Sequence, residues 1–156
     1  MSSLFNNKII TTAFLLIIIS ECDRNSYEKI EVSRWESYLE EISGKPYSLD
    51  GRHIIIIAYP SYCGSCLREI QSWNELIRKG KVNEYDLVLI MIDKSEVSVA
   101  TFIQGNDIKL NYYIDKSGKV LNYDLVSSIP MRVVLEDRSI KMIHELGDAE
   151  SFKKLL

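Results

Sequence analysis

Two cysteines three positions apart are the residues of this chain whose types and spacing best suit chemistry. Cys63 and Cys66 enclose Gly64 and Ser65, and they stand where an apolar run ending at Pro60 gives way to helical periodicity. A cysteine at a helix N-terminus faces unsatisfied backbone N–H groups and the positive end of the helix dipole, both of which stabilise a thiolate. The pattern predicts thiol–disulfide exchange, with Cys63 as the nucleophile and Cys66 as the thiol that resolves the mixed disulfide.

Two other uses of such a cysteine pair remain open. A zinc site usually takes four ligands at paired spacing, whereas this sequence has no second cysteine pair, and His53 and His144 are isolated. A structural disulfide would close a loop so short that the gain in chain entropy is small. We therefore favour exchange over both alternatives, and we expect neither a metal nor another cofactor.

Glu69 and Pro130 are further candidates for the site. Glu69 follows Cys66 by three positions and shares its helix face. Its carboxylate is therefore a candidate acceptor for the proton of Cys66, the alternative being an ordinary solvated glutamate on a helix surface. Pro130 precedes an apolar segment and is expected at the entrance of a strand, the alternative being an ordinary turn proline.

Hydrophobic periodicity predicts a single α/β unit with a mixed sheet and helices on both faces. The predicted strands cover residues 53–59, 87–92, 112–115, 132–136 and 139–144, the last two forming an antiparallel hairpin. The predicted helices cover residues 31–42, 63–79, 96–106 and 148–156, with Ser95 as an N-cap and a turn over residues 116–119. The first two strands flank a helix, so they should be parallel.

The first twenty-two residues are expected to lie outside that unit. Lys8 precedes a largely apolar run, Ile9 to Ser20, which has the length of a signal-peptide core and is shorter than the roughly 20 residues of a membrane span. A buried core helix is the alternative. We therefore expect a signal peptide over residues 1–22, a spacer and helix over 23–43 and the folded domain over 44–156.

Cys22 stands where bacterial lipoprotein precursors carry their lipidated cysteine. The segment Ile19-Ser20-Glu21-Cys22 resembles a lipobox, although Glu21 replaces the usual small residue. A spare cysteine after a cleaved signal is the alternative, but an unpaired thiol is a liability in an oxidising compartment. The formal net charge of −3, without long runs of one sign, gives no indication of nucleic-acid binding.

Together these residues resemble the thioredoxin superfamily, and within it the TlpA-like thiol–disulfide oxidoreductases of bacterial cell envelopes. The segment Ile54 to Ile70 matches the family's strand, active-site cysteines and downstream glutamate. Tyr113 to Val120, then Tyr123 and Ile129-Pro130, resembles the turn that leads to the family's cis-proline. The sequence departs from the family at Tyr62, where tryptophan is usual, and at Ser65 and Gln71, where prolines are common.

The resemblance implies a thioredoxin-like three-layer fold and a cis Pro130 that faces Cys63. It implies that Tyr62, Ile129 and Pro130 contact a bound substrate chain, and it strengthens the role of Glu69. The expected activity is reduction of disulfides in exported proteins by a lipid-anchored protein on the periplasmic side, recharged by a membrane electron donor. A thioredoxin-like lipoprotein that binds a partner or a metal without turnover is the alternative. A peroxiredoxin is disfavoured, because Pro60 stands where its Thr or Ser would be.

Overall fold

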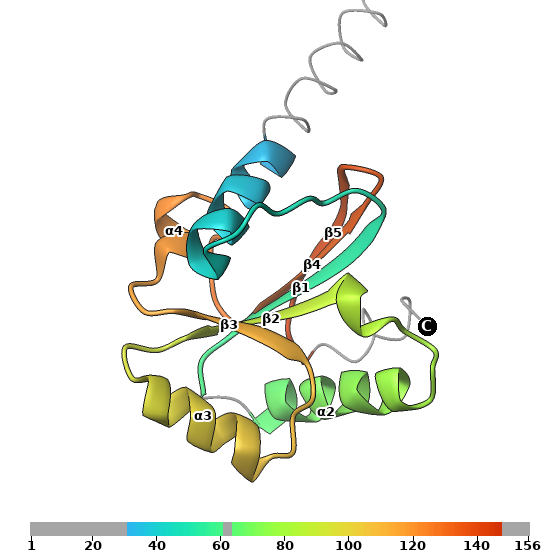
Figure 1. Ribbon diagram of the computed structural model, residues 1–156, viewed down its shortest axis with the longest axis vertical. Coiled ribbons are helices and arrows are strands. Elements are labelled where there is room, and N and C mark those ends of the chain that lie inside the picture. Colours follow the sequence, from blue (N-terminus) through green and yellow to red (C-terminus); the bar gives the residue numbers. More distant parts are fainter. Residues whose placement is uncertain (1–30, 61–63, 148–156) are drawn as a thin grey trace, which may run out of the picture.

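The computed structural model describes residues 31–60 and 64–147. A helix over residues 31–43 precedes a five-stranded mixed sheet whose strand order is β3-β2-β1-β4-β5. The elements follow in the order β1 (Arg52–Ala58), α2 (Gly64–Arg78), the 3-10 helix η1 (Glu84–Asp86), β2 (Leu87–Ile92), α3 (Glu96–Gly105), β3 (Asn111–Asp115), α4 (Lys119–Asn122), β4 (Met131–Glu136) and β5 (Ser139–Glu145). Figure 1 shows the sheet between two layers of helices.

Strand β1 lies at the centre of the sheet because both of its faces are apolar. It pairs in parallel with β2 and antiparallel with β4. Successive side chains of a strand point to opposite faces, so Ile54 and Ile56 enter one hydrophobic cluster while Ile55 and Ile57 enter the other. A strand that is covered on both faces has a continuous apolar sequence. This is why β1 could be predicted from the sequence alone.

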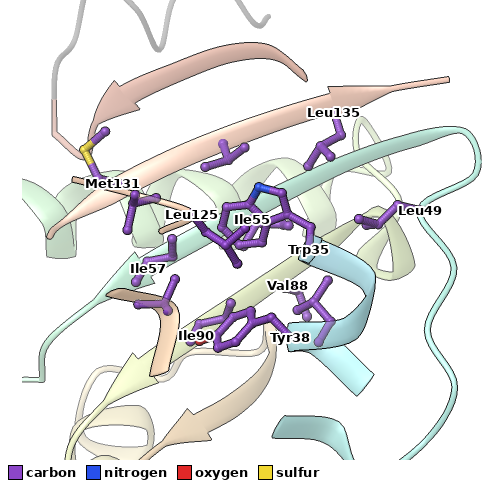
Figure 2. Packing of buried hydrophobic residues seen from close by; sticks show 14 of the residues in the cluster. Trp35, Tyr38, Leu49, Ile55, Ile57, Val88, Ile90, Leu125, Met131 and Leu135 are labelled. Atoms are coloured by element: carbon purple, nitrogen blue, oxygen red, sulfur yellow. The ribbon is translucent and has the colours of Figure 1, made fainter. Parts of the chain in front are cut away.

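One face of the sheet is covered by the helix over residues 31–43 and by α4. Trp35, Tyr38 and Leu39 are fully buried, and they pack with side chains of β1, β2 and β4 in a single cluster. Figure 2 shows Trp35 and Tyr38 against Ile55, Ile90 and their neighbours. Burying each large apolar side chain contributes about 1.5–3 kcal/mol. The helix therefore shares its hydrophobic core with the sheet.

The other face is covered by α2 and α3, which lie together on the opposite side of the sheet in Figure 1. Helix α2 directs Cys66, Ile70 and Trp73 into this second cluster at helical spacing. Helix α3 adds Val99 and Ile103 and begins at the expected cap, since the Ser95 side chain accepts a hydrogen bond from the backbone N–H of Ser98. Cys66 thus sits at the N-terminal end of a helix whose inner face is firmly packed.

The fold class and most of the predicted elements are confirmed. Strand β2 has the predicted limits, β1 and β2 are parallel, and β4 and β5 form the predicted hairpin. Helix α4 was not predicted: Lys119 was assigned to a turn, but Val120 N donates to Oδ2 of the buried Asp115 at 3.0 Å and so begins a single helical turn. The predicted signal segment, the Cys22 lipobox and the C-terminal helix fall outside the described residues. Within residues 31–60 and 64–147, no helix has the length and apolarity needed to cross a membrane.

Candidate functional site

Cys66 is held in the first turns of α2. Its side chain is 4% exposed, and its sulfur is part of a disulfide. Helix α2 begins at Gly64, immediately after residues 61–63. Tyr62 and Cys63 lie in that segment, outside the described residues. The structure therefore places one sulfur of the candidate site at the start of a helix, as the sequence predicts for Cys66.

The Cys66 sulfur contacts a peptide group at the end of β5. Its Sγ atom lies 3.9 Å from the carbonyl oxygen of the buried Leu146. A disulfide sulfur carries no proton, so in the oxidised state this is a contact and not a hydrogen bond. After reduction, the Cys66 thiol is a weak donor with a carbonyl acceptor already in place. The Leu146 carbonyl can therefore accept a hydrogen bond from Cys66 in the reduced state but not in the oxidised state.

Glu69 lies one turn along α2 and is 5% exposed. Its Oε2 atom accepts a 2.6 Å hydrogen bond from the backbone N–H of Gly147, and its Oε1 atom accepts a 3.4 Å bond from Nε1 of Trp73. The alternative interpretation of Glu69 as a solvated surface residue is therefore wrong. Its role in proton transfer remains a prediction, now with a defined set of partners.

Arg132 is the residue of the site that sequence analysis missed. Its side chain is fully buried on β4, and its Nη1 atom forms an ion pair with Oε1 of Glu69. An arginine is almost never fully buried unless it is paired. The available signal was the arginine itself, which interrupts an otherwise apolar strand between Met131 and Val133. Its partner is 63 positions away in the sequence, so spacing gave no indication of it.

Pro130 confirms the expectation of a cis peptide bond, which joins it to Ile129. Both residues are partly exposed, and Ile129 packs against the first hydrophobic cluster. The carbonyl of Pro130 accepts a 3.3 Å hydrogen bond from the backbone N–H of Leu146. Leu146 thus bonds to Pro130 through its N–H and contacts the Cys66 sulfur through its carbonyl. The end of β5 brings Cys66, Glu69 and Pro130 together.

The described part of the chain offers no metal site. Across residues 31–60 and 64–147, no three His, Cys, Asp or Glu side chains are grouped so that they could hold an ion. The functional groups that meet at the site are a sulfur, a carboxylate, a guanidinium and main-chain peptide groups. Such a set suits proton and thiol chemistry.

Comparison with known proteins agrees with this geometry. A relative named thiol-disulfide oxidoreductase ResA, from Bacillus thuringiensis subsp. konkukian, is 23% identical over 133 residues, which are 82% of this chain and 76% of the relative. A second ResA, from Bacillus cereus strain ZK, is 24% identical over 107 residues, which are 69% of this chain and 61% of that relative.

Solved structures with the same fold carry related names. StoA from Bacillus subtilis superposes with a TM-score of 0.53 at 16% identity, covering 74% of this chain and 92% of StoA. The thioredoxin domain of a thiol-disulfide oxidoreductase from Bacteroides vulgatus gives a TM-score of 0.55 at 14% identity, covering 73% and 88% of the two chains. These likenesses confirm the thioredoxin-like fold, and the named relatives agree with the TlpA-like resemblance. The model of the AhpC/TSA family matches residues 30–139, more than half of the sequence, and the chain therefore belongs to the AhpC/TSA family.

Proposed function

We propose that this protein is a thiol–disulfide oxidoreductase whose redox couple is Cys63–Cys66. The observation that carries the proposal is the disulfide-bonded Cys66 in the first turns of α2, with its sulfur against the Leu146 carbonyl. The other two cysteines of the chain, Cys22 and Cys63, lie outside the described residues. We assign Cys63 as the partner because it precedes Cys66 by three positions in the sequence. The names of the ResA relatives support the same activity.

The proposed reaction moves two electrons from the protein to a substrate disulfide. The Cys63 thiolate attacks one substrate sulfur, a mixed disulfide forms, and one substrate thiolate leaves. The Cys66 thiol then loses its proton and attacks Cys63, which releases the second substrate thiolate. The products are the Cys63–Cys66 disulfide and, after uptake of protons, two substrate thiols. The reverse sequence of the same steps would oxidise a substrate dithiol.

Glu69 is the proposed acceptor of the Cys66 proton. Of the contacts within the described residues, Oε1 accepts from Arg132 and Trp73, whereas Oε2 accepts from Gly147 alone. A carboxylate oxygen accepts about two hydrogen bonds. We therefore assign the proton to Oε2, the oxygen that bonds to the N–H end of the same peptide whose carbonyl end contacts the Cys66 sulfur.

The remaining parts of the proposal concern substrate and location. Ile129, Pro130 and Tyr62 are proposed to line the surface that receives an extended substrate chain, and the partly exposed Ile129-Pro130 segment is compatible with this. Disulfide-containing exported proteins are the proposed substrates, and a membrane donor is the proposed source of electrons. Residues 1–22 are proposed to direct export, and lipidation of Cys22 to anchor the protein on the periplasmic side of the cell envelope.

Cysteine variants test the activity on the full chain. Reduction of a protein disulfide substrate by Cys63→Ser should be abolished, and Cys66→Ser should accumulate a mixed disulfide that mass spectrometry detects. Cys22→Ser is the matched control, because it removes the third cysteine and should leave exchange unchanged. Loss of exchange in Cys22→Ser, or full exchange in Cys63→Ser, would reject the proposed couple. If the wild-type protein exchanges no disulfide, the alternative function, binding of a partner or a metal without turnover, replaces the proposed one.

A further inference from the structure

A continuous chain of contacts runs from a buried cation to the redox sulfur. Arg132 on β4 pairs with Oε1 of Glu69, and Oε2 of Glu69 accepts from the N–H of Gly147. The carbonyl that contacts the Cys66 sulfur belongs to Leu146. Leu146 C=O and Gly147 N–H are the two ends of one planar peptide group. A single peptide therefore joins the Cys66 sulfur to the Glu69 carboxylate.

We propose that Arg132 is a positioning residue for the step in which Cys66 resolves the mixed disulfide, acting through Glu69 and the Leu146–Gly147 peptide. This inference rests on the proposed function of the Cys63–Cys66 couple. By binding Oε1, the guanidinium turns Oε2 toward the peptide, and the hydrogen bond from Gly147 fixes the carbonyl beside the Cys66 sulfur. Linked hydrogen bonds polarise one another in a buried site.

The position of Arg132 explains why it acts on one step. It follows the cis Ile129-Pro130 bond by two residues, and its side chain is fully buried. The contacts described above lead from Arg132 through Glu69 and the Leu146–Gly147 peptide to the Cys66 sulfur. The second step should therefore depend on Arg132 more strongly than the first.

Charge gives the expected direction of the pH effect. In the resolving step, the Cys66 proton leaves and negative charge develops beside Glu69. A nearby positive charge favours the ionised form of an acid, and its removal disfavours that form. Neutralising Arg132 should therefore move the pH profile of the resolving step to higher pH.

His144 is a titratable neighbour of Arg132 on this face of the strands, where Arg52 and Glu136 also lie opposite each other at the far end of β1 and β4. It lies directly opposite Arg132 in the pairing of β4 with β5, while Ile56 of β1 lies on the other side. Directly opposed residues place their side chains on the same face of a sheet. Histidine ordinarily changes charge near neutral pH. A His144→Gln variant is therefore the control for this neighbour of Arg132.

The experiment follows both chemical steps in one reaction. Every protein in this experiment carries Cys22→Ser, so that Cys63 and Cys66 are its two thiols. The reduced chain is mixed with an aromatic disulfide that releases a coloured thiolate. The first equivalent is released when Cys63 attacks, and the second when Cys66 resolves the mixed disulfide. The rate of each phase is recorded between pH 5 and pH 9 for wild type, Arg132→Gln and Arg132→Lys. The matched control is Arg78→Gln, since Arg78 lies on α2 in an exposed pair with Glu75.

Arg132→Gln should slow the second phase about tenfold, equivalent to a shift of its pH midpoint of about one unit upward. The first phase should stay within about twofold of wild type, and Arg132→Lys should restore most of the second phase because it restores the charge. Arg78→Gln should change neither phase. When His144→Gln is added to Arg132→Gln, the upward shift of the pH midpoint of the second phase should remain. Equal slowing of both phases, or an unchanged second phase, would overturn the inference.

A double variant keeps the test decisive if Arg132→Gln does not fold. Glu69→Gln/Arg132→Gln carries no unpaired buried charge, so it avoids the cost of an isolated carboxylate. If Arg132 acts only through Glu69, the double variant should resolve at the rate of Glu69→Gln alone. Further slowing in the double variant would overturn the inference. Absence of two phases in the wild-type protein would instead reject the proposed function.

Discussion

Two buried carboxylates lie on opposite faces of the sheet and differ in their partners. Asp115, which is 1% exposed, accepts hydrogen bonds from the Tyr38 hydroxyl at 3.0 Å, Val120 N at 3.0 Å and Ser117 N at 3.3 Å. All three donors are uncharged. Burial raises the pKa of the Tyr38 hydroxyl, and the charge of Asp115 raises it further, so this donor keeps its proton at any physiological pH.

Glu69 differs because one of its donors is the buried guanidinium of Arg132. Hydrogen bonds to a charged group contribute about 1.5–3 kcal/mol each, and this holds for both carboxylates. Glu69 has in addition the attraction of a full opposite charge within the buried site. The partners of Asp115 belong to a turn and to two helices, so Asp115 fixes local structure. The partners of Glu69 join α2, β4 and the end of β5 beside Cys66. The comparison indicates that a paired buried charge is found where the chemistry is proposed.

The largest effect on stability should come from removing the charged partner. Arg132→Met leaves the Glu69 carboxylate buried without its cation, and we expect the free energy of unfolding to fall by about 3–5 kcal/mol. Urea denaturation at pH 7 measures it. The control, Glu69→Gln/Arg132→Met, should lose much less because no buried charge is left unpaired. Equal losses in the two variants would mean that the pair contributes through packing and not through charge.

A smaller effect is expected at the uncharged site. Asp115→Asn removes one of the two acceptor oxygens and leaves a buried donor unsatisfied, so the free energy of unfolding should fall by about 1–3 kcal/mol. Because Asp115 lies on the opposite face from Cys66, the rate of disulfide exchange should be unchanged. The same urea experiment and the exchange assay measure the two quantities. A large loss of the exchange rate in Asp115→Asn would show that Asp115, like Glu69, affects the proposed chemistry.

The smallest effect should come from a third carboxylate, Glu36, which pairs with Arg138 near the surface. Burial alone would raise the pKa of Glu36, but hydrogen bonds from Arg138 and from the backbone N–H of Leu49 outweigh it, and the pKa is lowered. A lowered pKa in the folded state stabilises the protein above the ordinary glutamate pKa of about 4.3 and is lost as the pH falls through the folded value.

Arg138→Gln should therefore lower the urea midpoint slightly at pH 7, because exposed ion pairs contribute little. The difference from wild type should shrink as the pH falls through the folded-state pKa of Glu36, where the wild-type carboxylate takes up its proton. Urea titrations at pH 7 and pH 3 make the comparison. Arg138 also pairs with Asp50, whose pKa is lowered as well. A difference as large at pH 3 as at pH 7 would show that Arg138 stabilises the fold by contacts other than its charge.

Local patterns predicted most of the fold and, within the candidate site, Cys66, Glu69 and Pro130, but they did not predict Arg132. Strand β2 and the Ser95 cap follow from an unbroken apolar run and from one side chain next to a helix start. Helix α4 was missed because four residues are too few to show a period. Cys66 and Glu69 were found because they lie on one helix face. The pairing with Arg132 depends on how α2 packs over β4, which no local pattern contains.

The reduction potential of the proposed couple tests the central claim most directly. The full chain is equilibrated with glutathione buffers of defined potential, its free thiols are alkylated, and mass spectrometry reports the state of each cysteine. We predict that Cys63 and Cys66 gain and lose label together in one reversible two-electron transition, with a tenfold change in the equilibrium constant for about every 30 mV. A Cys66 that stays oxidised at every potential, or that pairs with Cys22, would contradict the account.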